Sequence, residues 1–302
     1  MEKELCGVIL VNKHKGVTSH DIVFKIRRLF NTKKVGHTGT LDPLATGVLP
    51  VLVGRAAKAA EYLLSENKEY IASIKLGITT DTEDITGKIL TKSDTLPNKN
   101  EFFDACLHFT GEIDQVPPMY SALKVNGEKL VDLARKGIEV ERQSRKINVY
   151  SIEPKTINEQ EGEYEIKVAC SKGTYIRTLC ADIGAYLGCG AVMTELKRTK
   201  SGAFDIADTH TISELEEMDF DTRCSLLIPV EQLFTEAERV VLPDFYARLC
   251  KSGCEIYQKK IKTDFPTDSF IRICDKNGFF ALGQVRDYPE GSAIKAIKLF
   301  VI

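Results

Sequence analysis

Residues 35–50 read VGHTGTLDPLATGVLP, and this stretch decides how the chain around it folds. It contains three glycines, two prolines, a single histidine (His37) and a single carboxylate (Asp42). Glycine allows sharp turns and close backbone approach, while Pro43 biases the residue before it toward extended geometry. The stretch leads into an apolar run at residues 48–53, which is typical of a buried strand. We therefore expect His37 and Asp42 on a stiff loop anchored in the core. The alternative is an ordinary turn in which Asp42 only hydrogen-bonds its neighbours.

Composition sets broad bounds on the fold and on the partner. With 302 residues, the chain is long enough for one large core or two domains. The formal net charge is −2, so the molecule as a whole has no field that would attract a polyanion. Basic residues nevertheless gather in three runs, at residues 25–34, 142–146 and 197–200. Each run alone can be a solvated face, but three runs beside the motif segments favour an RNA-facing surface.

The cysteines and the acidic segments do not indicate a metal site. There are nine cysteines and no Cys-x-x-Cys pair. A zinc site at Cys250, Cys254 and Cys274 is disfavoured, because no histidine lies nearby and the spacing is unusual. The acidic segment 77–87 lacks the spacing of an EF-hand loop, so we expect no calcium there either. Residues 1–6 are too charged for a secretory leader and no apolar run could span a membrane, so we expect reduced thiols in a cytoplasmic protein.

Hydrophobic periodicity predicts the elements that carry the motifs. We expect strands at residues 6–11, 68–76 and 164–170, and helices that follow Thr18-Ser19, span 56–64 and 98–109, and end before Gly188. On the strand at 68–76, Tyr70 shares the apolar face. From about residue 240 the chain changes to short β-like runs separated by turn residues, which is typical of a small β domain.

Residues 36–47, GHTGTLDPLATG, resemble the signature of the bacterial B-type pseudouridine synthases, which act at position 55 of tRNA. Further segments recur in that family's order, at residues 7–13, 68–70, 77–87, 117–124 and 171–177. The resemblance implies an α+β fold, with a mixed, mainly antiparallel central sheet flanked by helices. It also implies a catalytic domain at 1–237 with an RNA-clasping insertion at about 117–146. A small RNA-binding β-barrel of the PUA-like kind would follow at 238–302.

The family's reaction moves uracil from an N1–C1′ bond to a C5–C1′ bond, so it is an isomerisation that requires no cofactor. Asp42 is the candidate carboxylate, acting by covalent attack or by stabilising a charged sugar intermediate. The routes through C1′, C6 and a glycal all stay open. Arg177 can keep Asp42 ionised through a bidentate pair, with a purely structural ion pair as the alternative. Tyr70 can stack on the base, and its phenol is the candidate for C5 proton removal, which needs a favourable environment because a free phenol titrates near pH 10.

The resemblance also implies contacts around this centre. His37 is suited to fill the space of a base flipped out of the RNA, although it can also simply hydrogen-bond its own loop. Further residues would line or support the pocket, namely Tyr175, Leu196, Lys13 and Asp84. The insertion would contact RNA through basic side chains, namely Lys124, Arg142, Arg145 and Lys146. In two places the sequence departs from the family pattern, with His14 in place of a proline and Val131 in place of an aromatic residue.

These observations favour a stand-alone enzyme that makes pseudouridine at position 55 in the tRNA T loop. Its partner would be the T-arm, without cofactor, metal or protein partner. A guide-RNA-dependent synthase is disfavoured by the full insertion at 117–146 and by the absence of basic tails. A protein that only binds or refolds tRNA is disfavoured because Asp42, Tyr70 and Arg177 are all present. A glycoside hydrolase normally needs two carboxylates, and this loop offers one.

Overall fold

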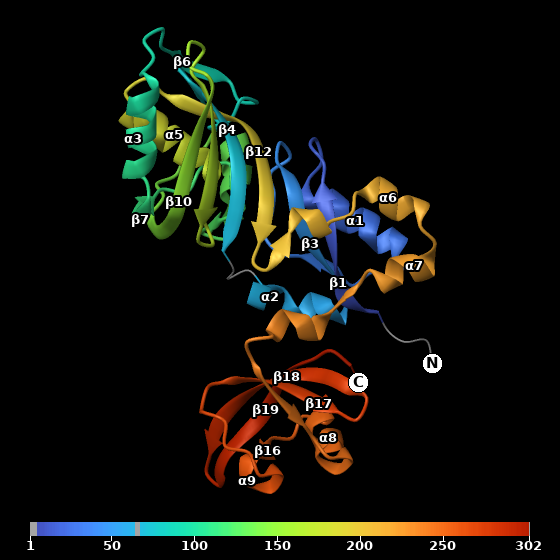
Figure 1. The fold of residues 1–302 in the computed structure, drawn as a ribbon. Helices are drawn as coiled ribbons and strands as arrows, with labels where there is room; N and C mark the ends of the chain where they lie inside the picture. The colour runs from blue at the N-terminus through green and yellow to red at the C-terminus, as the bar shows by residue number, and fades with distance from the viewer. Residues whose placement is uncertain (1–4, 64–66, 302) are drawn as a thin grey trace.

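The computed structural model describes residues 5–63 and 67–301, and it shows a large sheet joined to a smaller C-terminal one (Figure 1). The large sheet has ten strands among these residues, and only the β3–β12 pairing is parallel. Its main path contains β14 (Ile228–Pro229), β1 (Cys6–Lys13), β3 (Thr46–Gly54), β12 (Ala191–Ser201), β4 (Lys68–Leu76), β11 (Glu163–Cys170), β10 (Arg145–Asn158) and β7 (Gly111–Gln115). Beside this path, β2 (Val35–His37) pairs with β3, and β13 (Phe204–Asp205) pairs with β12. The expected α+β fold with a mixed, mainly antiparallel central sheet is therefore confirmed.

Strands β1 and β3 are apolar on both faces because they lie between two cores. On β1, Ile9 and Val11 belong to the core that the helices cover, whereas Val8 and Leu10 belong to a second core. On β3, Leu52 also points into that second core. A strand buried on both faces needs a continuous apolar run rather than an alternating one. The apolar run after the Asp42 loop is thus explained by its position in the sheet.

Helices α1 (Ser19–Leu29), α3 (Lys99–His108), α5 (Ile176–Tyr186) and α6 (Ile212–Glu217) bury side chains in the first core. Thr18 and Asn98 begin α1 and α3 with capping boxes, and both helices lie where the sequence predicts them. The predicted helix at 56–64 is confirmed over its described residues, although its first half is a 3₁₀ helix. A 3₁₀ helix η1 (Arg55–Ala59) leads into the short α2 (Ala60–Leu63), and residue 64 lies outside the described residues. The segment starts directly from Gly54 at φ 67 without a side-chain cap, which favours a tight 3₁₀ turn.

The insertion at 117–146 is a small hairpin followed by one helix. It contains β8 (Lys124–Val125), β9 (Glu128–Lys129) and α4 (Leu130–Arg135). Arg142 donates to the carbonyl of Pro117 at 3.1 Å and so ties the two ends of the insertion together. Before it, β5 (Ile78–Thr80) and β6 (Ile89–Lys92) form a separate two-stranded sheet.

The C-terminal part has its own sheet, in the order β15 (Glu238–Val241), β17 (Phe270–Asp275), β18 (Gly278–Tyr288), β19 (Gly291–Leu299) and β16 (Ile256–Tyr257). Its helices are α8 (Asp244–Lys251) and α9 (Gln258–Ile261). The linking elements are η2 (Ile206–Asp208), α7 (Phe220–Ser225) and η3 (Val230–Phe234). Leu282 and Phe300 pack with Leu52 in the second core, so the two sheets share apolar surface. A domain boundary at 238 stays a prediction.

Within the described ranges, no helix is long and apolar enough to cross a membrane.

Candidate active site

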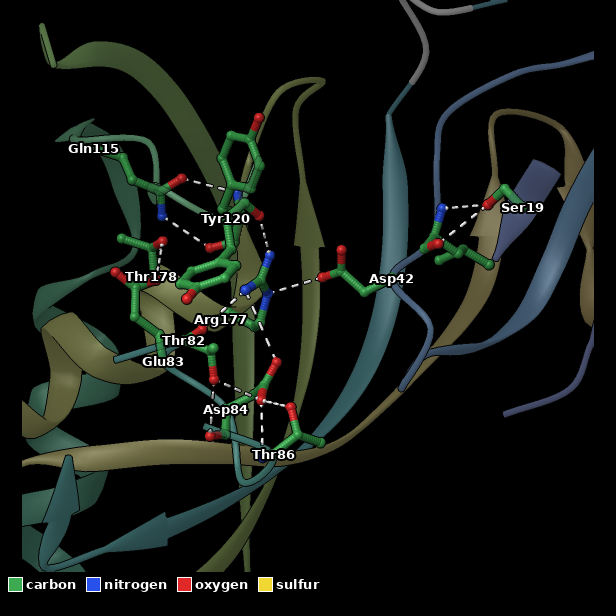
Figure 2. Close-up of polar contacts among 12 residues, drawn as sticks. Ser19, Asp42, Thr82, Glu83, Asp84, Thr86, Gln115, Tyr120, Arg177 and Thr178 are labelled. Carbon is green, nitrogen blue, oxygen red and sulfur yellow. Dashed lines mark hydrogen bonds and ion pairs between the residues drawn. The ribbon is translucent and has the colours of Figure 1, made fainter. Parts of the chain in front are cut away.

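The loop that carries Asp42 is fixed at its base by Ser19. The Ser19 hydroxyl accepts from the backbone N–H of Leu41 at 2.8 Å and donates to the carbonyl of the same residue at 3.1 Å (Figure 2). Because Thr18 caps α1, the Ser19 side chain is available for this contact. One turn later, the backbone N–H of Ala45 donates to the carbonyl of Asp42 at 3.0 Å. The loop is therefore held at the residue before Asp42 and closed by a turn after it.

Lys13 lies beneath the same loop and is fully buried. Its ammonium donates to the carbonyls of Val17 at 2.8 Å, His14 at 3.0 Å and Pro43 at 3.5 Å. Burial lowers the pKa of Lys13 to about 8, although the negative charge of Asp42 acts in the opposite direction. Sequence reasoning expected Lys13 near the site. The structure places it where main-chain oxygens replace the water that an ammonium normally binds.

Arg177, in the first turn of α5, connects Asp42 to the rest of the pocket. Its Nε donates to Asp42 Oδ2 at 2.8 Å, while its two terminal nitrogens donate to the carbonyls of Thr82 at 2.9 Å and Tyr120 at 2.8 Å (Figure 2). Nη1 also lies 3.9 Å from Asp84 Oδ2. The predicted bidentate pair is therefore wrong, because main-chain carbonyls occupy the other donors. Asp42 Oδ1 accepts no hydrogen bond from a described residue, and the Asp42 side chain is 36% exposed.

Asp84 organises the acidic loop behind Arg177. Its Oδ1 accepts from the backbone N–H of Thr86 at 2.9 Å, from the Thr86 hydroxyl at 2.5 Å and from the Thr82 hydroxyl at 2.9 Å. Asp84 is buried, so these contacts replace its hydration. The loop that supplies the Thr82 carbonyl to Arg177 is thus shaped by the same carboxylate that faces the guanidinium.

Sequence reasoning missed a second polar layer next to this loop. Glu83 has a left-handed backbone, with φ 62, and its carboxylate accepts from the Thr178 hydroxyl at 2.6 Å (Figure 2). Burial raises the pKa of Glu83, and burial followed by the charge of Glu83 raises the pKa of Asp182 to about 6. The acidic residues of this segment were visible in the sequence, but their contact with α5 is a long-range feature.

The predicted pocket residues Tyr70 and Leu196 lie on adjacent strands and are both buried. In the β4–β12 pairing Leu196 lies opposite Ala72 and Tyr70 lies opposite Arg198, so all four side chains share one face of the sheet. Burial raises the pKa of Tyr70, and the nearby Arg198 only partly opposes this effect. The Tyr70 phenol is therefore protonated at neutral pH, and proton removal by it needs a further change in its surroundings.

Tyr175 and His37, two further residues predicted at the site, lie on other elements. The backbone of Tyr175 is clamped by the buried Gln115, which accepts from its N–H at 2.8 Å and donates to its carbonyl at 3.0 Å (Figure 2). Gln115 was another residue that sequence reasoning missed. The ring of His37, on β2, forms no hydrogen bond with a described residue, and its Nδ1 is buried. Burial, followed by the charge of Arg198, lowers the pKa of His37, so the ring is neutral at neutral pH.

The predicted RNA-binding residues differ in how they are held. Lys124 and Arg145 are exposed and form no ion pair with a described residue. Arg142 is tied to the Pro117 carbonyl and to Glu139 at 3.3 Å, and Lys146 pairs with Glu112 at 2.5 Å. The two unpaired side chains are thus the ones most available to phosphates.

The prediction that the basic run at 197–200 faces RNA is wrong for Arg198. This side chain is 1% exposed, whereas Lys197 and Lys200 on either side are exposed. Strand alternation turns Arg198 inward, next to the Asp42 loop.

None of the nine cysteines, all of which lie in the described residues, forms a disulfide bond. No cluster of three or more His, Cys, Asp or Glu side chains in residues 5–63 and 67–301 could hold a metal ion.

Comparison with known proteins identifies the family. The model of the TruB family pseudouridylate synthase N-terminal domain matches residues 27–176, and that of the tRNA pseudouridylate synthase B C-terminal domain matches residues 177–235. The chain is 44% identical over 296 residues to tRNA pseudouridine synthase B of Clostridium tetani, covering 98% of this chain and 99% of that protein. It is 42% identical over 283 residues to the protein of the same name from Francisella tularensis, covering 93% and 91%.

Solved structures show the same architecture. A chain in the crystal structure of a Cbf5-Nop10-Gar1 complex matches with a TM-score of 0.70 and 26% identity, covering 98% of this chain and 85% of that one. A chain in the structure of an H/ACA RNP bound to a substrate RNA containing 2′-deoxyuridine matches with a TM-score of 0.69, 25% identity and the same coverage. With two family models that together match residues 27–235 and with relatives above 40% identity, the chain belongs to the TruB family of pseudouridylate synthases.

Proposed function

We propose that the chain converts uridine to pseudouridine at position 55 in the T loop of tRNAs, and that Asp42 is its catalytic group. The observation that carries the assignment of Asp42 is its contact with Arg177, a single hydrogen bond of 2.8 Å from a buried guanidinium. The tRNA substrate rests on the 44% identity to a tRNA pseudouridine synthase B across nearly the whole of both chains.

The contacts of Asp42 suit a reaction in which charge develops at the sugar. Arg177 engages only Oδ2 of Asp42, so Oδ1 stays available to a ligand. Because the other guanidinium donors are fixed by carbonyls, the charge near Asp42 does not need to reorganise during the reaction. The carboxylate can attack C1′, add to C6 or stabilise the sugar during elimination, and all three routes release the N1–C1′ bond.

The remaining steps belong to the neighbours of Asp42. In our proposal Tyr70 stacks on the freed uracil while it turns, and Leu196 and Tyr175 exclude water from it. C5 then bonds to C1′, the C5 proton is lost and N1 gains a proton. Because the Tyr70 phenol starts protonated, it can accept the C5 proton only after its own proton has passed to N1, and it is then restored. Atoms and electrons balance without an oxidant or a nucleotide. The neutral His37 fills the space that the flipped base leaves in the RNA, which offsets part of the cost of unstacking.

The proposed partner is the T-arm alone. In our proposal Lys124 and Arg145 of the insertion contact its phosphates, and Arg142 and Lys146 contribute less because each is already paired. We propose that no protein partner is required and that the enzyme acts in the cytoplasm on tRNA. A guide-RNA-dependent activity has the weaker support, since the matching chain of the Cbf5-Nop10-Gar1 complex is 26% identical, whereas the tRNA pseudouridine synthase B of Clostridium tetani is 44% identical.

The test is direct. The purified protein is incubated with an unmodified T-arm stem-loop, without guide RNA or other protein, and pseudouridine is mapped. We expect conversion of the single target uridine, no conversion when that position is cytidine, and no loss of rate on adding a chelator. Conversion that depends on a guide RNA or a second protein would favour the alternative.

A further inference from the structure

Arg198 is the largest fully buried side chain of the described residues, and it carries a permanent charge. No carboxylate of a described residue lies within 4.0 Å of its guanidinium. A buried charge without a counter-ion is costly unless polar groups replace its hydration. The groups that do so therefore indicate what this arginine is for.

The guanidinium bridges the two sides of the Asp42 loop. Nε donates to the carbonyl of Val48 at 2.7 Å, and Nη2 donates to the carbonyl of Gly39 at 3.1 Å. Gly39 precedes Asp42 by three residues and Val48 follows it by six. One rigid fork thus sets the distance between the strand that enters the loop and the strand that leaves it.

The backbone of Arg198 fixes the same loop from the neighbouring strand. Arg198 lies opposite Gly47 in the parallel β3–β12 pairing. Gly47 has φ 104, and a Cβ there would lie 2.1 Å from the Arg198 carbonyl oxygen. A Cβ on Gly39, at φ 71, would lie 3.3 Å from Arg198 Nη1. The close approach of the Arg198 backbone therefore requires glycine at position 47, and its guanidinium leaves little room for a Cβ at position 39.

On its other side, Arg198 lies directly opposite Tyr70 in the antiparallel β4–β12 pairing. Among the described residues, β12 lies between β4, which carries Tyr70, and β3, into which the Asp42 loop leads. The Arg198 charge lowers the pKa of both Tyr70 and Lys13, although burial dominates in each case. Arg198 thus contacts both sides of the Asp42 loop through its guanidinium and faces Tyr70 on the neighbouring strand.

We propose that Arg198 is a positioning residue that keeps the Asp42 loop and Tyr70 in fixed relation, so that both reach the same uridine. This inference rests on the proposed roles of Asp42 and Tyr70. Arg198 itself is too buried to contact RNA, so its loss should affect the chemical step and leave T-arm binding nearly unchanged.

The experiment compares Arg198→Met and Arg198→Lys with the parent enzyme in single-turnover assays on the T-arm. Methionine removes both donors and the charge, while lysine keeps the charge but cannot reach both carbonyls with one fork. We expect Arg198→Met to lose about 100-fold in rate, the size expected when reacting groups move by about 1 Å. Arg198→Lys should recover part of this loss, and T-arm affinity should stay within about threefold in both variants.

Arg223 provides a matched control. It also donates to two carbonyls, those of Leu215 at 3.0 Å and Met218 at 2.6 Å, but it lies on α7, outside the pocket. Arg223→Met should lower the thermal midpoint and keep a rate, per folded molecule, within about twofold of the parent. If Arg198→Met does not fold, Arg198→Lys combined with Tyr70→Phe replaces it. Their effects on rate should be non-additive, because the two residues act as one unit.

The outcomes separate the two proposals. An inactive parent enzyme would contradict the proposed function, whatever the variants do. An active parent with Arg198 variants that react at the parental rate, or that lose rate only in proportion to unfolded protein, would overturn the positioning role. Additive effects of Arg198→Lys and Tyr70→Phe would overturn it as well.

Discussion

The Asp42 loop and the 117–146 insertion use basic residues in opposite ways. Around the loop, Lys13, Arg177 and Arg198 are buried, and most of their donors are directed to main-chain carbonyls. In the insertion, Lys136 pairs with Glu128 and Lys124 faces solvent, and Arg142 is the exception because it donates to the carbonyl of Pro117. Carbonyls hold a cation in place without cancelling its charge, whereas carboxylates neutralise it. The buried cations around the Asp42 loop, which we call the centre, therefore have a fixed geometry, whereas the surface charges of the insertion can adjust their positions.

The first prediction tests the centre through Asp42→Asn. The amide nearly matches the carboxylate in size, and Arg177 keeps its contacts with the carbonyls of Thr82 and Tyr120, so the pocket should survive. The charge and the nucleophile are lost, so single-turnover pseudouridine formation should fall below detection. T-arm affinity should stay within about tenfold, or roughly 1.4 kcal/mol. A folded variant that reacts near the parental rate would show that Asp42 is an ordinary turn residue.

The second prediction compares one glycine from each region. Both Gly47 and Gly127 have left-handed backbones, with φ 104 and φ 87. A Cβ on Gly47 would meet the Arg198 carbonyl at 2.1 Å, while nothing lies within 4 Å of a Cβ on Gly127. Gly47→Ala should therefore cost at least about 3 kcal/mol in free energy of unfolding. Gly127→Ala should cost about 1–2 kcal/mol, the price of the left-handed conformation alone.

Urea unfolding of the two glycine variants measures this difference. Equal losses would mean that the backbone around Gly47 can shift away from Arg198, and the two regions would then be equally adaptable.

The third prediction concerns the insertion and its salt dependence. Binding of the T-arm should weaken with added salt, because phosphate contacts release counter-ions. Lys124→Ala and Arg145→Ala should each reduce the slope of log K against log salt by about 1. Lys146→Ala should change it less, since Glu112 already pairs with that ammonium at 2.5 Å. Slopes that none of the three variants changes would remove the insertion from the RNA interface.

Local signals made much of the fold predictable. The capping boxes at Thr18 and Asn98, the alternation of β4 and the apolar run of β3 each involve residues close together in the chain. The α+β class followed from the family resemblance. The 3₁₀ geometry of the helix after β3 could not be predicted from local signals, because it depends on how Gly54 turns the chain.

The sequence predicts which residues belong to the site, but not which hydrogen bonds they form. The Arg177 fork could not be assigned from sequence, because its carbonyl partners Thr82 and Tyr120 lie 95 and 57 residues away. The sequence predicts surface charge at Arg198, because this residue stands between two lysines. A signal was present, since Leu196 was expected in the pocket and residues two apart on a strand share a face. The partners of Arg198 are 150 and 159 residues away, so its bonds could not be predicted.

The last prediction tests whether a buried cation of the centre changes stability with pH while an exposed one does not. Burial lowers the pKa of Lys13 from 10.5 to about 8 in the folded chain. Between these pH values the unfolded chain binds more protons than the folded chain, and stability rises with pH wherever that holds. Folding therefore carries a cost below pH 8 that is relieved as the pH rises toward 10.5. Relative to Lys13→Met, the parent's free energy of unfolding should rise by up to about 1.4 kcal/mol per pH unit in this window.

Lys124→Met is the control for this slope, because the Lys124 ammonium faces water in both the folded and the unfolded chain. The constant offset between the parent and Lys13→Met does not bear on the test, since methionine also leaves three carbonyls without their donor. Only the difference between the two slopes of unfolding free energy against pH reports the proton that Lys13 loses. If the parent and Lys13→Met have parallel curves from pH 8 to 10.5, the carbonyls around Lys13 solvate its charge as well as water does. Main-chain oxygens would then hold the cations of this centre at no electrostatic cost, and the rigidity of the loop would have to be explained by packing alone.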